Sequence, residues 1–417
     1  MKIFRITSNS YPNLLKEKVK KNLNKFSNFN NYIDIYKNQN FIKHRSLGRY
    51  MKDKEIFDIM FNDEISQKIW VRENTKIKND KLTLDQILFE QIKILKPDII
   101  YVCSGAGYLI NENILKEIKK NFKVKLILFW GDEFPENKNF FLIYDIIITS
   151  NKLYQKKFEK LGIKSRVFPY CIDIDDCLLL EDNINDKKNK FIFAGETGFK
   201  LIDHSRRLIN LRKIIDKTDL MIYSKEKKFI KRSKIKIFNS IINFVYLFPP
   251  LLIRLIFNRF LNSSFYYQIS RRQKVENKKN LLLKIENQVS INEYAPDRIK
   301  NGLFGNDYFN LLRNSEIVLN LHRDELNDYA NIRCFEVTGS KSCLLTDKKI
   351  LMKEYFDCDD EVVAFDSIDE LEEKYKFLRN NPEKLKNISL AGYIKTINNY
   401  TTKNYGEYLD KLINNLY

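Results

Sequence analysis

Arg333 and Glu336 stand three residues apart in segment 331–339, whose sequence pattern predicts a helix. Residues at i and i+3 lie on one face of a helix, so both side chains are expected on the same side. A carboxylate accepts hydrogen bonds from hydroxyl groups, and the fork of an arginine matches the oxygens of a phosphate. The alternative to a binding site is an ordinary ion pair on a helix surface.

Glycine and polar residues also lie at or just after the ends of two predicted strands in the second half of the chain, residues 190–194 and 317–321. Together with a nearby arginine they are Gly195, Gly198, Arg206, Asn320 and His322. Ligands of parallel sheets bind at the carboxyl ends of strands, and glycines let backbone N–H groups approach a phosphate. A solvated strand end and a routine glycine turn are the alternatives at these positions.

Two aspartates are candidates for catalysis. Asp132 follows the predicted strand 124–130 and would take the proton of a substrate hydroxyl. Asp328 precedes Glu336 by eight residues. Both are equally compatible with a place in a loop or at a helix cap. No metal site is expected, because the three histidines and six cysteines are scattered and no two cysteines have C-x-x-C spacing.

Two α/β domains are expected to position these residues. At 417 residues the chain is too long for one compact core, and short apolar strands alternate with helical patterns almost throughout. We therefore predict two Rossmann-like domains with parallel sheets that face a cleft. The first spans residues 1–180 and the second 190–400, and a helix at 401–417 is expected to pack back on the first domain. Such sheets favour a nucleotide or another phosphorylated ligand.

Three successive segments resemble the C-terminal donor-binding domain of family 1 glycosyltransferases, in particular the group of the spore maturation protein CgeB. They are Ser-Glu-Ile-Val-Leu-Asn-Leu-His at 315–322, Asn-Ile-Arg-Cys-Phe-Glu-Val-Thr-Gly at 331–339 and Cys-Leu-Leu-Thr-Asp at 343–347. The resemblance covers residues 98–224 and 303–417. It implies a GT-B-like fold with the acceptor domain first and the nucleotide-sugar domain second.

The resemblance also implies a metal-independent, hexosyltransferase-like enzyme without a cofactor. Glu336 would bind the ribose, Arg333 would reach the phosphates, and Gly339 would permit close approach of the backbone. Many retaining relatives have a second glutamate where Asp328 stands here. The expected reaction moves a sugar from a nucleotide-sugar donor to a glycan or lipid-linked acceptor in cell-surface polysaccharide synthesis. A non-catalytic, membrane-associated protein of the same fold is the first alternative. A nucleic-acid-binding protein, suggested by the net charge alone, is the second.

Positive charge is concentrated in one stretch of the chain. The net charge is +19, and residues 225–279 hold 14 Lys or Arg against two acidic residues, a local balance of +12. They surround an uncharged run of 17 residues, 237–253, that contains Pro249–Pro250. Apolar burial combined with attraction to anionic headgroups is typical of an interfacial helical hairpin. We therefore predict a basic apolar helical insertion at 225–280 that contacts an anionic membrane surface.

The basic residues expected at that surface are Lys231, Arg232, Lys234, Lys236, Arg254, Arg271 and Arg272. An internally packed helical subdomain is the alternative. No nucleic-acid partner is expected, because the apolar part is too large for a surface that tracks phosphates. The scattered cysteines indicate a reducing compartment, and residues 1–7 have the pattern of a strand instead of a signal peptide. We expect a cytoplasmic protein, peripheral on the inner face of the cytoplasmic membrane.

The wild-type protein is therefore expected to float with anionic liposomes. Charge should make this attachment salt-sensitive, and inserted Phe and Leu side chains should leave a salt-resistant part. Each basic side chain near such a surface contributes about 1 kcal/mol at most, and physiological salt screens it over about 8–10 Å. Replacing the Lys and Arg residues of 231–236 and 271–274 by Gln should reduce flotation. Wild-type protein that stays at the bottom of the gradient with every vesicle would contradict the membrane prediction.

Overall fold

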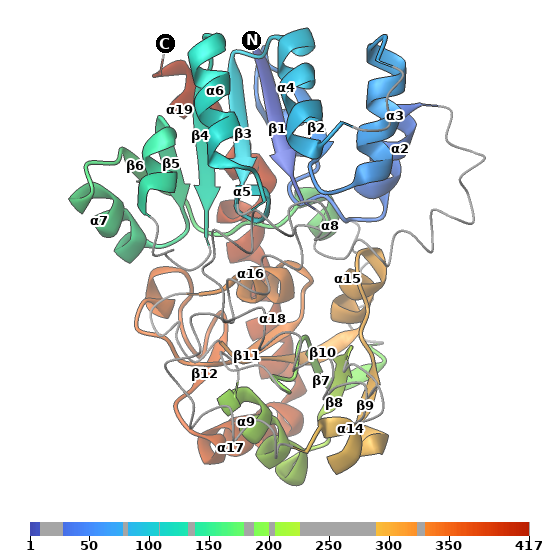
Figure 1. Ribbon diagram of the computed structural model, residues 1–417. Helices are drawn as coiled ribbons and strands as arrows, with labels where there is room; N and C mark the ends of the chain where they lie inside the picture. The colour runs from blue at the N-terminus through green and yellow to red at the C-terminus, as the bar shows by residue number, and fades with distance from the viewer. Residues whose placement is uncertain are drawn as a thin grey trace, which may run out of the picture.

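The computed structural model describes residues 1–8, 28–77, 82–107, 109–131, 138–178, 187–199, 205–225, 289–322 and 330–416. The predicted residues that lie outside these ranges are Asp132, Asp328 and, in the insertion, Lys231, Arg232, Lys234, Lys236, Arg254, Arg271 and Arg272. The described residues form two α/β units stacked one above the other (Figure 1). None of their helices is long and apolar enough to cross a membrane.

The first unit contains a parallel sheet of six strands in the order β2-β1-β3-β4-β5-β6. The strands are β1 (Lys2–Thr7), β2 (Glu55–Met60), β3 (Ile99–Cys103), β4 (Lys125–Trp130), β5 (Ile146–Thr149) and β6 (Ser165–Val167). The central strands are almost continuous apolar runs, as expected where helices cover both faces of a sheet. Ile99 to Val102 of β3, for example, are all buried.

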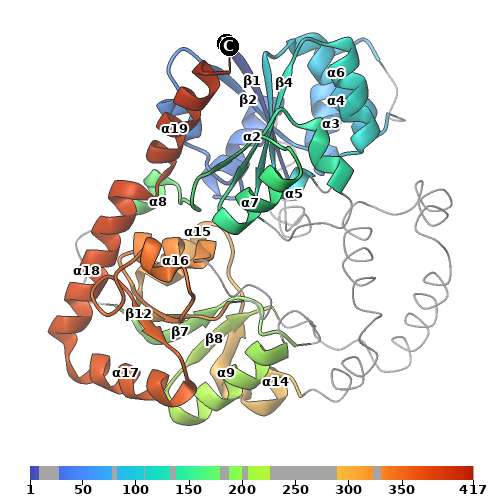
Figure 2. The same cartoon turned by 90° about the vertical axis from the view of Figure 1, so that its left-hand side faces the viewer.

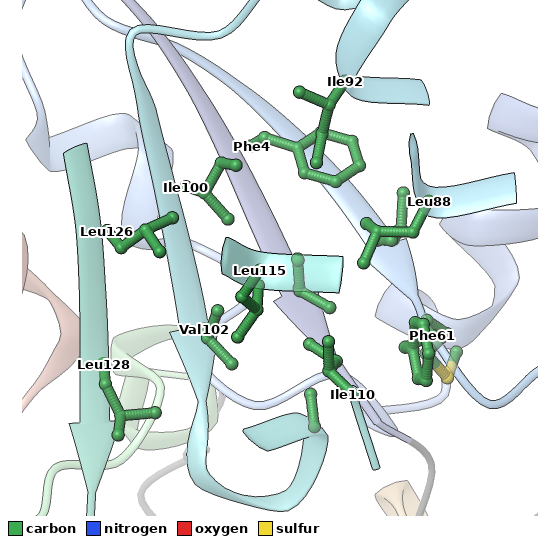
Figure 3. Packing of buried hydrophobic residues seen from close by; sticks show 14 of the residues in the cluster. Phe4, Phe61, Leu88, Ile92, Ile100, Val102, Ile110, Leu115, Leu126 and Leu128 are labelled. Atoms are coloured by element: carbon green, nitrogen blue, oxygen red, sulfur yellow. The ribbon is translucent and has the colours of Figure 1, made fainter. Parts of the chain in front are cut away.

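Most helices of this unit pack on one face of the sheet. They are α2 (Phe29–Asn38), α3 (Glu64–Asn74), α4 (Leu84–Leu95), α5 (Ser104–Gly107), α6 (Glu112–Asn121) and α7 (Lys152–Lys160), with the 3-10 turn η3 (Lys138–Ile143). The other face is covered by the 3-10 turn η2 (Leu47–Tyr50) and by the last helix of the chain, and the short helix α8 (Ile174–Leu178) lies on the way to the second unit. Figure 3 shows Leu88 of α4 and Leu115 of α6 among the buried side chains over Ile100 of β3. A capping box between Thr83 and Gln86 starts α4.

The second unit contains another parallel sheet of six strands, in the order β12-β11-β10-β7-β8-β9. The strands are β7 (Asn189–Ala194), β8 (Met221–Ser224), β9 (Ile299–Asn301), β10 (Ser315–Asn320), β11 (Cys343–Asp347) and β12 (Val363–Phe365). The helices are α9 (Ser205–Lys217), α14 (Ile291–Tyr294), α15 (Asn306–Arg313), α16 (Ile332–Gly339), α17 (Ile368–Asn380), α18 (Pro382–Asn399) and α19 (Thr402–Asn414), with 3-10 turns η7 (Pro296–Arg298) and η8 (Met352–Glu354). The prediction of two Rossmann-like α/β domains is confirmed by these two sheets.

The last helix returns to the first unit. Figure 2 shows α18 running along the second unit and α19 continuing beside the first sheet. Tyr405 and Leu409 of α19 are buried in one cluster with Ile99 and Ile127 of the first sheet. The hydroxyl groups of Tyr405 and Tyr101 also form a hydrogen bond of 2.8 Å. The core of the first unit therefore includes side chains from the C-terminal end of the chain.

Candidate functional site

The residues that follow β7 and β10 meet at the carboxyl edge of the second sheet. The two strands are neighbours, but the chain leaves them in opposite directions, from β7 toward β8 and from β10 toward β11. Such a reversal is a topological switch point, where open α/β sheets bind their ligands. Arg207 of α9 joins the two strand ends, because its guanidinium donates to the carbonyl oxygens of Glu196 (3.1 Å) and Leu321 (2.6 Å).

Arg333 and Glu336 lie on one face of α16 beside Tyr308 of α15. Arg333 Nη1 is 3.5 Å from Glu336 Oε2, and Tyr308 donates its hydroxyl to the same oxygen at 2.9 Å. The Arg333 guanidinium also lies over the Tyr308 ring, 4.6 Å from its centroid. These two contacts of the carboxylate are both to Oε2, so they leave Oε1 to another partner. The side chains are 26% and 15% exposed, which keeps both within reach of a ligand.

The two glycines after β7 bring the backbone close to this cluster. A Cβ at Gly195 would lie 3.8 Å from Arg333 Nη2, so the end of β7 faces the guanidinium. Gly198 has a φ of +88°, a conformation that side chains with a Cβ rarely adopt. Glycine therefore sets the conformation of this turn, which lies opposite Arg333. A phosphate-binding turn at a switch point is expected to have the same arrangement.

Asn320 and His322 are buried, and their polar atoms are bonded to the protein. His322 Nδ1 is 2.7 Å from Asp347 Oδ1, and its Nε2 accepts the backbone N–H of Asn331 at 3.3 Å. Since Nε2 accepts a hydrogen bond, the ring proton lies on Nδ1 and is donated to Asp347. Asn320 accepts from the side chain of Asn331 at 3.2 Å. Both residues thus contact Asn331, the N-cap residue of α16, and their predicted contact with a ligand stays a prediction.

Asp347 is the anionic member of this network. Its Oδ1 accepts from the backbone and the ring of His322, and its Oδ2 is 2.8 Å from Lys349 Nζ. Burial alone would raise the pKa of Asp347, but His322 and Lys349 outweigh it and hold the pKa well below the ordinary value of 3.8. Asp347 is therefore ionised throughout the neutral pH range.

A pocket of about 260 Å³ opens beside the network, between the first turns of α9 and α17. Its lining consists of Arg206, Arg207, Asn210, Leu321, His322, Asp347, Lys348, Lys349, Phe365, Asp366, Ser367 and Ile368. Four cationic residues stand against two carboxylates, so the lining favours an anion. Arg206 is exposed at the surface and lines this pocket.

Gly339 lies at the opposite end of α16 from Asn331. A Cβ at this position would overlap Ile172 and would lie 3.3 Å from Cys177 Sγ. Ile172 belongs to the segment that links the two units. The close approach seen here is therefore made by this linking segment, and the role of Gly339 in nucleotide binding stays a prediction.

The first unit contributes the carboxyl end of β4 to the region between the units, where the arrow of β4 points toward the second unit (Figure 1). Gly131 follows this strand, and its carbonyl oxygen accepts the hydroxyl of Tyr170 at 2.5 Å. Asp132, the predicted base, is the next residue and lies outside the described residues, so its role stays a prediction. The described ranges contain no group of three or more His, Cys, Asp or Glu residues that could hold a metal ion.

Sequence reasoning missed Tyr308, Asn331 and Asp347. Tyr308 comes from α15, which precedes β10, and no spacing links it to Glu336 before the fold is known. Asp347 carried a usable signal, because it ends a buried parallel strand next to the one that ends at Asn320.

Residues 275–410, about a third of the chain, match the model of a protein family described as glycosyl transferase-like. No curated protein sequence matches the chain. The fold is similar to that of several solved structures. HepE of Anabaena, in complex with UDP-glucose, is 12% identical, with 100% of both chains covered and a TM-score of 0.52.

Two further structures cover nearly all of the chain. A glycosyltransferase from Rickettsia africae is 13% identical, with 99% of this chain and 97% of that chain covered and a TM-score of 0.50. Sucrose-phosphate synthase from Thermosynechococcus elongatus is 8% identical, with 100% and 99% covered and a TM-score of 0.53. At such identities the likeness concerns the fold, and it confirms the predicted GT-B-like pairing of two Rossmann-like domains.

Asp347→Asn is expected to lower the free energy of unfolding by about 1–3 kcal/mol at neutral pH, because His322 and Lys349 lose their anionic partner. The pKa of Asp347 is lower in the folded protein than its ordinary value of 3.8. This stabilisation is therefore complete above about pH 5 and is lost as the pH falls through the folded pKa. Urea unfolding of both proteins at about pH 7 and about pH 3 measures it. If the two proteins differ in unfolding free energy by the same amount at both pH values, the lowered pKa of Asp347 in the folded protein is contradicted.

Proposed function

We propose that the protein is a glycosyltransferase that moves a sugar from a nucleotide-sugar donor to an acceptor hydroxyl. The observation that carries this proposal is the placement of Arg333 and Glu336 at the switch point of the second sheet, opposite the glycine turn after β7. The glycosyl transferase-like match at 275–410 includes both residues. The structures of HepE with UDP-glucose, and with UDP and glucose, support a nucleotide sugar as the ligand of this fold.

In the proposed complex, Glu336 accepts hydrogen bonds from the ribose hydroxyls and Tyr308 keeps its carboxylate in place. Arg333 binds the diphosphate, close to the backbone of Gly195. The acceptor oxygen attacks the anomeric carbon while the bond from that carbon to the phosphate oxygen breaks. Negative charge then grows on the diphosphate, and fixed donors aimed at this charge lower the barrier.

Asp132 is proposed to act as the base that takes the proton of the acceptor hydroxyl, and Asp328 is proposed to lie near the donor sugar. Both proposals come from the sequence. Stabilisation of the leaving diphosphate by arginine supports metal-independent transfer. Arg206 and Arg207 add positive charge at the neighbouring pocket. Transfer without a bound metal or a cofactor is therefore part of the proposal.

The acceptor is proposed to be a glycan or a lipid-linked glycan in cell-surface polysaccharide synthesis. The basic, apolar stretch at 225–280 supports this choice, because a protein attracted to the inner face of the cytoplasmic membrane would meet lipid-linked acceptors. We propose no nucleic-acid partner.

Glu336→Gln and Arg333→Ala should each weaken nucleotide binding by about 1–3 kcal/mol, because each removes a charged hydrogen-bonding group from the site. A thermal-shift screen of UDP-, GDP-, ADP- and CMP-sugars identifies the donor, since a ligand of the native state raises the melting temperature. Titration calorimetry with that nucleotide then gives the affinity of each variant.

Matched controls are Glu316→Gln and Arg298→Ala, which change the same residue types at the opposite edge of the sheet, where β10 and β9 begin. They should bind as the wild type does. Asp132→Asn should bind the donor normally and lose turnover. Wild-type affinity in folded Glu336→Gln and Arg333→Ala would contradict the proposed donor site.

A further inference from the structure

The first turn of α16 is held by a neighbouring strand and not by its own cap. Asn331 is the N-cap residue, and its side chain makes no capping hydrogen bond to the helix. Its backbone N–H instead donates to His322 Nε2, and its side-chain amide donates to Asn320 Oδ1. Both partners come from the end of β10. The start of the helix is thus tied to the strand that precedes it.

His322 is itself fixed from the other side by Asp347. The ring is 1% exposed and donates from Nδ1 to Asp347 Oδ1, which also accepts the backbone N–H of His322 at 2.9 Å. Asp347 ends the adjacent strand β11, and Lys349 holds its second oxygen. The ring therefore bridges a carboxylate on β11 and Asn331, the N-cap residue of α16.

This bridge sits directly before the residues of the donor site. Arg333 lies two residues after Asn331, and Glu336 lies five residues after it. A shift of the first turn of α16 would therefore move both side chains. We propose that His322 and Asp347 are positioning residues, which present Arg333 and Glu336 to the donor through the N-terminus of α16. This inference rests on the proposed function of the site, but the hold on the helix exists without any ligand.

Two substitutions of similar size distinguish a hydrogen bond to the Asn331 N–H from general packing by the His322 ring. The side-chain oxygen of glutamine reaches about the place of Nε2, so His322→Gln retains an acceptor for the Asn331 N–H. The shorter asparagine reaches only the place of Nδ1, so His322→Asn retains a partner for Asp347 and leaves that N–H without one. A residue that only fills space would show no difference between these two polar variants.

Hydrogen exchange of the ligand-free protein, followed by mass spectrometry on peptides that cover 331–336, measures the hold directly. His322→Asn and Asp347→Ala should exchange this turn about tenfold faster than the wild type, the change expected for one buried hydrogen bond. His322→Gln should stay near the wild type, and so should Lys353→Ala, a change at an exposed lysine beyond β11. Equal exchange in His322→Asn and His322→Gln would overturn the proposal.

Calorimetry with UDP as the probe then tests whether the hydrogen bond between Asn331 and His322 affects nucleotide binding. His322→Asn should raise the Kd for UDP by about tenfold, and His322→Gln should restore most of the affinity. Altered exchange without a change in the Kd would also overturn the positioning role. If the wild type binds none of the four nucleotide sugars while exchange still follows the predicted order, the proposed function fails and the hold on α16 stands.

Discussion

The two passages of the chain between the units are hydrogen-bonded to each other. Ile172, on the way out of the first unit, donates to the carbonyl oxygen of Tyr400 at 3.0 Å and accepts from the backbone of Thr402 at 2.8 Å, on the way back. Thr402 Oγ1 also accepts the backbone N–H of Ile174 and bonds to Ser46 Oγ. All of these groups are buried or partly buried, so breaking the pairing would leave polar atoms without partners. This paired crossing therefore fixes the two connecting passages against each other at the boundary between the two sheets.

The crossing also reaches the candidate site, because the side chain of Ile172 packs where Gly339 lacks a Cβ. Helix α16 is therefore contacted at both ends, by Ile172 at its last residue, Gly339, and by His322 at its N-cap residue, Asn331. Arg333 and Glu336 lie between these two anchors. A helix held in this way presents its charged groups in one orientation, which is the preorganisation that transfer chemistry requires. The contacts at the two ends of α16 thus connect the arrangement of the two units with the geometry of the candidate site.

Much of the fold follows from local pattern. Short apolar runs such as Ile99 to Val102 are central parallel strands in sequence and in structure, and the i, i+3 spacing of Arg333 and Glu336 does place them on one face. Other assignments needed the fold. His322 at a strand end has the same sequence signal whether it faces solvent or is buried, and the presence of Asp347 and Asn331 decides between the two. Gly339 has the signal of a ligand-binding glycine, but its neighbour comes from a segment more than 160 residues earlier in the chain.

The central claim is that a nucleotide binds across the start of α16 and the glycine turn after β7. A crystal structure with the nucleotide sugar that binds best would test it most directly. Ribose density is expected within hydrogen-bond distance of Glu336, and diphosphate density between Gly195 and Arg333. Nucleotide density elsewhere, with Glu336 still bonded only to Tyr308 and Arg333, would contradict it.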